Sequence, residues 1–152
     1  MPSYLVTGGS GQLGHCFKAI VNEFPEIDLY FTSRNEVDIT ELKTLVNFYN
    51  KNSFDGIINC AAYTAVDQAE KEPERSFEIN TEGLKNIINF AENKNFSVIH
   101  FSTDYVFDGQ SSESYSEEAL TNPIGIYGES KLQGEVLLSK SRCKNVTIRT
   151  SW

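Results

Sequence analysis

Short apolar runs alternate with longer amphipathic stretches along the 152 residues of this chain. Five runs rich in β-branched, leucine and aromatic residues have the length of strands, at residues 4–7, 27–32, 55–62, 96–101 and 144–150. Apolar residues recur at helical spacing in the segments between them, after Gly14 and within 42–49, 74–93 and 126–139. This alternation predicts an α/β fold made of right-handed βαβ units on a parallel sheet. Thr40 is the predicted cap of the second helix.

A glycine-rich turn joins the first strand to the first helix. Its glycines, at 8, 11 and 14, permit a tight turn, the close approach of a pyrophosphate and close packing of helix on strand. Free N–H groups at the start of the helix would attract the negative charge. A purely structural turn would use the same glycines, but the strand before and the helix after favour a dinucleotide or nucleotide site. We therefore expect a Rossmann-like, doubly wound sheet that binds its cofactor through Gly8, Ser10, Gly11, Gln12, Leu13 and Gly14.

The second strand leads into the place where dinucleotide folds recognise the adenosine ribose. Ser33 and Arg34 occupy it. An acidic residue there would bind a ribose 2′-hydroxyl, whereas an arginine can meet a 2′-phosphate with a charge-assisted contact. The sequence therefore favours NADP, with NAD as the alternative and a solvated loop arginine as the reading without function. Asp38 and Ile39 are expected to flank the adenine.

Two further segments are predicted to reach the cofactor. The third strand ends in the small residues Ala61 and Ala62, followed by Tyr63, which would let a ligand lie close to the backbone. Asn80 interrupts an otherwise apolar helical stripe, and its amide could orient a backbone group or a water near the site. A satisfied surface amide is the other interpretation of Asn80.

The candidate chemistry lies near the end of the chain. Ser102 and Thr103 follow the fourth strand, at the edge of a parallel sheet where ligands bind. Tyr127 and Lys131 are four residues apart in the last helix and therefore face the same side of it. A cation held beside a phenol favours the phenolate and lowers its pKa, so the pair could transfer a proton near neutral pH.

Composition narrows the class of protein. A single domain spanning residues 1–152 is expected from the length, and the formal net charge of -8 argues against nucleic acid and anionic membranes as partners. No apolar run approaches a membrane span, and the N-terminal residues do not resemble a secretory signal. Three isolated cysteines and two isolated histidines have no metal-ligand spacing, so we expect reduced thiols, a cytoplasmic location and no metal.

Taken in order, the motifs resemble those of the extended short-chain dehydrogenase/reductases, and within that group the dTDP-4-dehydrorhamnose reductases. The resemblance runs from end to end of the chain. It rests on Gly8-x-x-Gly11-x-x-Gly14, Asn59 to Glu70, Ser102-Thr103-Asp104-Tyr105-Val106-Phe107-Asp108-Gly109, Tyr127-Gly128-x-Ser130-Lys131 and Ile148-Arg149-Thr150-Ser151-Trp152.

The resemblance implies a role for each matching residue. Tyr127 would be the proton donor, Lys131 would lower its pKa and hold the nicotinamide ribose, and Thr103 would bind the substrate carbonyl. The implied reaction is NADPH-dependent reduction of the C4 ketone of dTDP-4-dehydro-6-deoxy-L-mannose to dTDP-L-rhamnose. The expected partner is thus a nucleotide-sugar, and the resemblance also allows a homodimer.

One departure from the family pattern changes the expectation. Family members continue beyond the Arg-Thr-Ser-Trp segment into a region that grips the nucleotide-sugar, so we expect a truncated chain that binds cofactor but turns substrate over poorly. Two alternatives stay open. A non-catalytic NADP-binding subunit, like the regulatory subunit of methionine adenosyltransferase, resembles the same reductases, and nucleotide-sugar epimerases and dehydratases share the Tyr and Lys.

Overall fold

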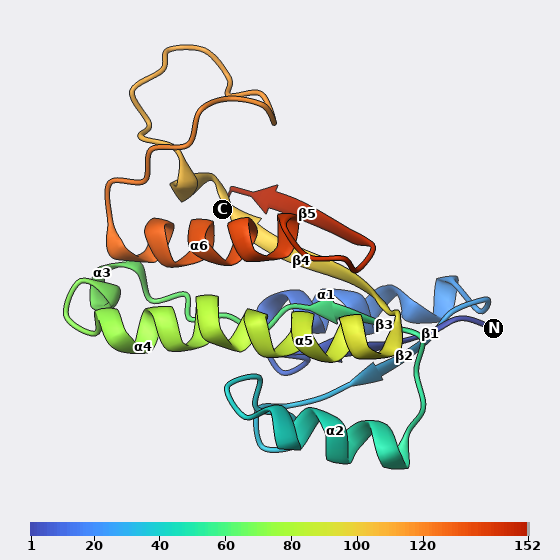
Figure 1. The fold of residues 1–152 in the computed structure, drawn as a ribbon. Helices are drawn as coiled ribbons and strands as arrows, with labels where there is room; N and C mark the ends of the chain where they lie inside the picture. The colour runs from blue at the N-terminus through green and yellow to red at the C-terminus, as the bar shows by residue number, and fades with distance from the viewer. Residues whose placement is uncertain (152) are drawn as a thin grey trace.

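The computed structural model describes residues 1–151, so Trp152, the last residue of the Arg-Thr-Ser-Trp motif, lies outside the described residues. Its five strands form one parallel sheet, with the order β2-β1-β3-β4-β5. The strands are β1 (Ser3–Thr7), β2 (Asp28–Phe31), β3 (Gly56–Asn59), β4 (Ser97–Thr103) and β5 (Asn145–Thr150). The predicted α/β fold with a parallel, Rossmann-like sheet is confirmed (Figure 1).

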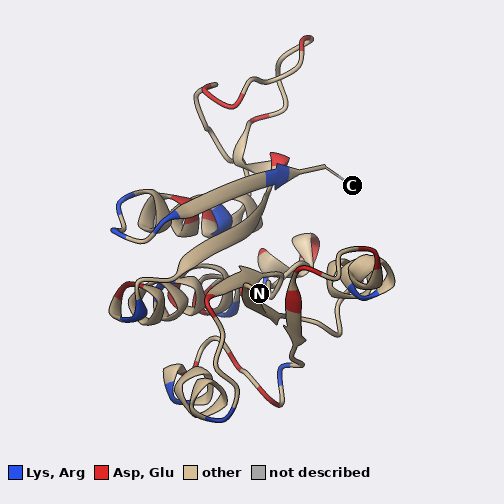
Figure 2. Cartoon of the chain, turned by 90° about the vertical axis from the view of Figure 1, so that its right-hand side faces the viewer, with Lys and Arg blue, Asp and Glu red and all other residues tan. Residues whose placement is uncertain are grey.

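Helices cover both faces of this sheet. Three of them lie on one face, α2 (Leu42–Lys51), α5 (Leu84–Lys94) and α6 (Ile126–Ser139), whereas α1 (Gln12–Ile20) lies on the other. Figure 2 shows the two layers on opposite sides of the twisted sheet. The distribution follows from right-handed crossovers, because the chain moves outward from β1 to β2 and then crosses back to β3, β4 and β5.

The main core fills the space between the sheet and the three-helix layer. Leu5, Ile57 and Val98 stand in register on neighbouring strands and are fully buried against α5. In the same core, aromatic rings from α2, α5 and the adjoining loops pack edge to face, and the ring centroids of Tyr49 and Phe54 are 5.1 Å apart. Full burial of one such side chain contributes on the order of 1.5–3 kcal/mol, so this cluster holds the helical layer on the sheet.

Buried polar side chains tie three strands together at the carboxyl ends of β1 and β3. Thr7, Asn59 and His100 are in register on β1, β3 and β4. The Thr7 hydroxyl donates to Asn59 Oδ1 at 2.7 Å, and Asn59 Nδ2 lies 3.1 Å from His100 Nδ1. The Asn59 amide can donate only through its nitrogen, so His100 accepts at Nδ1. These contacts hold together the edge of the sheet from which the candidate site is built.

The long helix expected at 74–93 contains a change of helical type. It consists of α4 (Pro73–Phe77), the π-helical segment η2 (Glu78–Gly83) and α5 (Leu84–Lys94). Sequence periodicity cannot reveal a single wide turn inside a helix, because the apolar spacing on either side of it is unchanged. Two short elements were also not predicted, namely η1 (Val21–Glu23) and η3 (Asp104–Val106). The structure further contains the short helix α3 (Val66–Ala69).

The prediction for Thr40 was wrong. Glu41, not Thr40, precedes the first turn of α2, and no side chain caps that helix. The Thr40 backbone N–H and hydroxyl instead both donate to Asp38 Oδ1, at 3.0 and 2.7 Å. A carboxylate two residues earlier binds both groups, which removes the hydroxyl from the helix end.

The edge of the sheet at β5 is open in the described part of the chain. Val146 and Ile148 stand beside Ile99 and Phe101 of β4, on one face of the sheet, and are 55% and 39% exposed. Residues 107–125 form a loop that extends beyond the sheet at the top of Figure 1.

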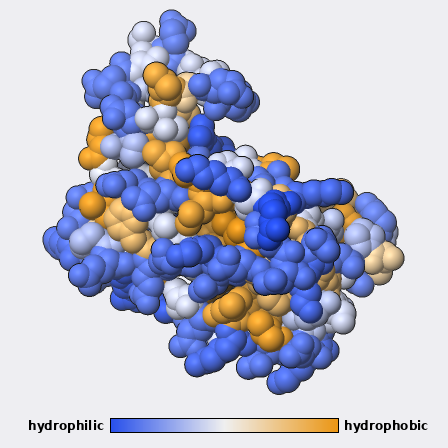
Figure 3. Space-filling model, viewed as in Figure 1, coloured by the Kyte–Doolittle hydropathy of each residue, from blue (hydrophilic) through white to orange (hydrophobic). Residues whose placement is uncertain are grey.

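Most of the surface is hydrophilic with smaller apolar areas, as Figure 3 shows for one face. No helix within residues 1–151 has the length and apolar character needed to cross a membrane.

Candidate active site and cofactor cleft

The glycine turn between β1 and α1 is built for close backbone contact. Gly8 has a φ of +65°, and a Cβ on it would lie 2.6 Å from the Ala61 nitrogen. A side chain at Gly14 would similarly come within 2.5 Å of Gly9 Cα. The helix α1 starts at Gln12 without a side-chain cap and without an acidic residue in its first turn. Free N–H groups and the positive end of the helix dipole therefore favour an anion at the start of α1.

A cavity of about 220 Å³ opens beside this turn, between the carboxyl ends of β1 and β3. The chain leaves β1 toward one edge of the sheet and β3 toward the other, so this is the position where open α/β sheets bind ligands. Eight predicted cofactor residues line the cavity: Gly8, Ser10, Gly11, Arg34, Asp38, Ile39, Ala61 and Ala62. Val37, Cys60 and Ile79 also line it, and their ordinary apolar character had not marked them in the sequence.

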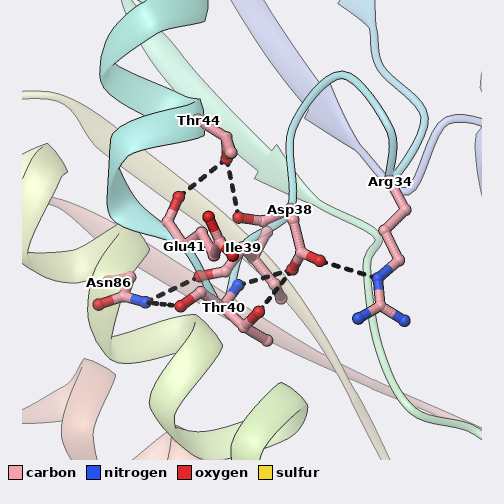
Figure 4. A network of polar contacts seen from close by, with 7 residues as sticks. All are labelled: Arg34, Asp38, Ile39, Thr40, Glu41, Thr44 and Asn86. Atoms are coloured by element: carbon pink, nitrogen blue, oxygen red, sulfur yellow. Dashed lines mark hydrogen bonds and ion pairs between the residues drawn. The ribbon is translucent and has the colours of Figure 1, made fainter.

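Arg34 is held at the mouth of this cavity by Asp38. Its Nε donates to Asp38 Oδ2 at 2.9 Å, and its side chain is 61% exposed (Figure 4). Partial burial acts to raise the pKa of Asp38, but hydrogen bonds from Thr40 and Arg34 outweigh it and lower that pKa overall. Asp38 is therefore an anchored carboxylate that orients the guanidinium. Ser33 lines neither this cavity nor the next, because its N–H and hydroxyl both bind Glu36 at 2.8 Å.

The same network fixes the backbone around Ile39. The Thr44 hydroxyl donates to the Asp38 carbonyl at 2.9 Å, and Asn86 Nδ2 donates to the carbonyls of Ile39 and Thr40 at 2.9 and 3.1 Å (Figure 4). Asn86 belongs to α5, so this contact ties the loop after β2 to the main helical layer. The wall of the cavity is thus held by side-chain bonds and not by regular secondary structure.

A second cavity, of about 280 Å³, adjoins the first and shares Gly11, Cys60 and Ala62 with it. It brings the glycine turn together with the predicted catalytic pair. Its lining consists of Gly11, Gln12, Leu13, Cys60, Ala62, Thr64, Phe101, Ser102, Tyr127, Lys131 and Thr150. Four of these, Cys60, Thr64, Phe101 and Thr150, had not been singled out from the sequence. The two cavities form one cleft along the carboxyl edge of the sheet.

Lys131 is buried below the second cavity. Only 2% of it is exposed, and its Nζ donates to the Phe101 carbonyl at 2.6 Å. Burial lowers the pKa of Lys131 to about 8, against the opposing influence of Glu135 and Cys60. Burial also raises the pKa of the Cys60 thiol to about 12, so that thiol stays protonated at neutral pH.

Tyr127 lies one turn earlier on α6 and is 8% exposed. Burial raises the pKa of its phenol, and the Thr103 hydroxyl acts in the opposite direction. The sequence-based expectation that Lys131 lowers this pKa is not met. The ammonium group turns to the Phe101 carbonyl, and burial of the phenol is the dominant influence.

Thr103 ends β4 beside this pair. It is 3% exposed and lines neither cavity. Its hydroxyl donates to Asp104 Oδ1 at 3.2 Å and accepts from the Tyr105 N–H at 3.2 Å. The Tyr105 ring meets the Tyr127 ring edge to face, with centroids 5.6 Å apart. Because Gly128 packs directly on the Tyr105 carbonyl, the start of α6 is pressed against the end of β4.

Three other predicted cofactor residues lie behind the cleft and line neither cavity, namely Gly14, Tyr63 and Asn80. Asn80 is 3% exposed, and its amide binds Tyr63 on both sides. The Tyr63 N–H donates to Oδ1 at 2.9 Å, and Nδ2 donates to the Tyr63 carbonyl at 3.1 Å. Asn80 therefore orients a backbone segment, which is the first of the two interpretations considered from the sequence. Within residues 1–151, no group of three or more His, Cys, Asp and Glu side chains is arranged to hold a metal ion.

A parallel sheet with a glycine turn, a strand-end hydroxyl and a Tyr–Lys pair in one cleft defines a Rossmann-like domain with a candidate dinucleotide site. The profile described as "RmlD substrate binding domain" matches residues 3–152. The chain belongs to this family, the RmlD/dTDP-4-dehydrorhamnose reductase family.

Individual relatives agree with the family assignment. The chain is 36% identical over 152 residues to the dTDP-4-dehydrorhamnose reductase of Aggregatibacter actinomycetemcomitans, covering all of this chain and 52% of that protein. It is 38% identical over 147 residues to the reductase of Sinorhizobium fredii, covering 97% and 49%. The chain thus spans about half the length of the curated relatives it matches.

A solved structure gives the same result. The dTDP-4-dehydrorhamnose reductase of Bacillus anthracis, in complex with NADP, superimposes with a TM-score of 0.93 at 37% identity. The match covers 100% of this chain and 54% of that one.

Proposed function

We propose that this chain is the NAD(P)-binding domain, residues 1–152, of a reductase that converts dTDP-4-dehydro-6-deoxy-L-mannose to dTDP-L-rhamnose. The observation that carries the proposal is the cleft in which Tyr127 and Lys131 of α6 face the glycine turn of α1. Support comes from family membership and from the 36–38% identity to named dTDP-4-dehydrorhamnose reductases.

The residues present fit a dinucleotide. Gly8 and Gly14 leave no room for side chains, and the uncapped start of α1 suits a pyrophosphate. Arg34 would meet a 2′-phosphate at the mouth of the first cavity, while Ile39 and Ala61 would pack on the adenosine half. NADPH is the expected cofactor, in keeping with the NADP bound to the B. anthracis relative.

NADPH, when bound, supplies the hydride that reduces the ketone at C4. The protein supplies the proton and the positions of the groups. Tyr127 donates its phenolic proton to the developing alkoxide, and the Thr103 hydroxyl would bind the same oxygen once it turns away from Asp104. The raised pKa of Tyr127 keeps its phenol protonated at neutral pH, which suits a proton donor.

Lys131 has two tasks in this scheme. Buried and bonded to the Phe101 carbonyl, it stands at the base of the cavity where a nicotinamide ribose would lie. Its positive charge would stabilise the tyrosinate left after proton transfer once the ribose draws its Nζ toward the cavity. The nucleotide-sugar itself would need contacts beyond this cleft, so we expect residues 1–152 alone to bind cofactor and to turn over substrate poorly.

The decisive experiment measures NADPH oxidation with dTDP-4-dehydrorhamnose, for residues 1–152 and for the protein in its full natural length. Stereospecific, stoichiometric oxidation by the full-length protein supports the reductase. Cofactor binding without turnover in the full-length protein would instead favour a regulatory subunit. Conversion of a nucleotide-sugar without net consumption of cofactor would favour an epimerase or dehydratase. Normal turnover by residues 1–152 would contradict the expected dependence on a further region.

A further inference from the structure

Ser130 stands between Tyr127 and Lys131 in α6 and is fully buried. Its hydroxyl donates to the Tyr127 carbonyl at 2.8 Å and accepts from Asn80 Nδ2 at 2.9 Å. The Ser76 hydroxyl lies 2.9 Å away. Because the single hydroxyl proton of Ser130 is used on Tyr127, Ser76 must be the donor in that contact. One hydroxyl thus makes three hydrogen bonds, to α4, η2 and its own helix.

The π-helical segment η2 makes this arrangement possible. Within it, the Asn80 side chain reaches the Ser130 hydroxyl, while the Thr81 hydroxyl donates to the Ser130 carbonyl at 2.9 Å. One turn further along α6, Gly134 packs so closely that a Cβ on it would lie 2.6 Å from the Asn80 carbonyl oxygen. Wide turns of this type inside helices frequently occur at functional sites. Here η2 and the first half of α6 are joined by side-chain hydrogen bonds and by close backbone packing.

These contacts continue behind the cleft through Asn80. The amide that donates to Ser130 also binds the N–H and carbonyl of Tyr63. Ala62, the next residue in the chain, lines both cavities. Side-chain bonds therefore connect the helix turn that bears Tyr127 and Lys131 with the part of the cleft wall at Ala62.

We propose that Ser130 is a positioning residue for this site: with Asn80 it sets the separation between the Tyr127–Lys131 pair and the wall at Ala62. This inference rests on the proposed function for its catalytic consequence. The reacting groups of an enzyme must be held within fractions of an ångström, and a displacement of about 1 Å can cost about a hundredfold in rate. A change at Ser130 should therefore alter catalysis more than cofactor affinity.

The test compares Ser130→Ala with Ser141→Ala as a matched control. Ser141 is close to the opposite end of the same helix, and its hydroxyl likewise donates to a backbone carbonyl, that of Leu138, at 2.6 Å. In the full-length protein, we expect Ser130→Ala to lower kcat at least tenfold and to change the KM for NADPH by less than about threefold. The control should leave both constants within about twofold.

A second measurement does not depend on turnover. With Cζ-labelled tyrosine, NMR follows the ionisation of Tyr127 in residues 1–152 with NADP⁺ added, and the resonance is assigned from Tyr127→Phe. We expect Ser130→Ala to move the midpoint by about half a pH unit or more, and Ser141→Ala to leave it unchanged. If Ser130→Ala does not fold, Ser76→Ala, which loses one of the three bonds, should still move the midpoint.

The outcomes separate the two proposals. An unchanged Tyr127 midpoint in folded Ser130→Ala, or in Ser76→Ala if Ser130→Ala is unfolded, would overturn the positioning role. Absence of turnover by the full-length wild type with an altered midpoint in the variant would instead overturn the proposed reaction and leave the positioning role intact.

Discussion

The Arg34 guanidinium donates only its Nε to Asp38, at 2.9 Å, so its two terminal nitrogens stay free of that carboxylate. In Figure 4 no dashed line joins either of them to Asp38. An arginine held in this way has both terminal nitrogens, with four N–H groups, left for a ligand, and its orientation is already determined before the ligand arrives. A phosphate oxygen is the natural acceptor for two such donors.

Replacement of Arg34 by alanine should therefore change cofactor preference. We expect Arg34→Ala to weaken NADPH binding by about tenfold or more, since a hydrogen bond to a charged group is worth about 1.5–3 kcal/mol, and to change NADH binding by less than about threefold. Fluorescence titration with each cofactor provides the measurement. Arg142→Ala is the control, because Arg142 is an exposed arginine paired with Glu92. Equal losses for NADPH and NADH would show that Arg34 does not read the phosphate.

Replacement of Tyr127 by phenylalanine removes only the phenolic oxygen. In the full-length protein, turnover should fall by about a hundredfold or more, while affinity for NADPH stays within about threefold. Tyr105→Phe makes the same chemical change on the neighbouring ring, which is half-exposed and 5.6 Å away. Initial-rate kinetics and equilibrium titration of both variants check the prediction. Undiminished turnover in Tyr127→Phe would exclude this phenol as the proton donor.

Two glycines with left-handed backbones allow backbone strain to be separated from crowding. Gly8 and Gly109 have φ values of +65° and +68°, but a Cβ on Gly8 meets Ala61 at 2.6 Å, whereas one on Gly109 meets nothing within 4 Å. Gly109→Ala should cost about 1–2 kcal/mol of unfolding free energy from strain alone. Gly8→Ala should cost more and should also abolish NADP binding. Urea unfolding and cofactor titration measure the two effects; similar results for both glycines would contradict the close approach seen at Gly8.

Burial of Lys131 should make stability depend on pH. Its folded pKa of about 8 lies below the usual value for lysine, so between about pH 8 and 10.5 the unfolded chain binds more protons at this group. The contribution of Lys131 to the unfolding free energy therefore rises with pH across that window, by on the order of 3 kcal/mol. Below pH 8 the full cost of burying the charged ammonium destabilises the folded chain.

Comparison with Lys131→Met isolates this contribution. Burial raises the pKa of Cys60 to about 12, so ionisation of this thiol lowers the unfolding free energy as pH rises above its unfolded pKa. Wild type and variant both contain Cys60, so this effect largely cancels in the difference between their unfolding free energies. We expect Lys131→Met to be more stable than wild type at pH 7, with the advantage lost by pH 10.5. Urea unfolding of residues 1–152 at several pH values tests this, and a difference that is independent of pH would refute it.

Sequence patterns predicted those parts of the site that depend on local chemistry. The glycine turn, the position of Arg34 after β2 and the four-residue spacing of Tyr127 and Lys131 are each contained in a short stretch of chain, and the structure brings them into one cleft. The limits of α6 were also predicted from its apolar spacing, at 126–139.

Features that depend on distant partners were not accessible in this way. Asn80 was assigned to cofactor binding, but its partners are 17 and 50 residues away, and they hold it behind the cleft. The direction of the Lys131 ammonium depends on the Phe101 carbonyl of another element, and the pKa of Tyr127 depends on how deeply it is buried. Such contacts arise only when the sheet and helices pack, and no local pattern records them.

The open edge at β5 affects how this chain behaves in solution. Within residues 1–151, β5 has no neighbouring strand on its outer side and bears the exposed Val146 and Ile148, so it offers a template for strand addition between copies. Preparations of residues 1–152 should therefore tend to self-associate as concentration rises, and Ile148→Lys on the exposed face should suppress that tendency. Sedimentation at several concentrations would reveal it, and dilute samples will give the cleanest binding constants.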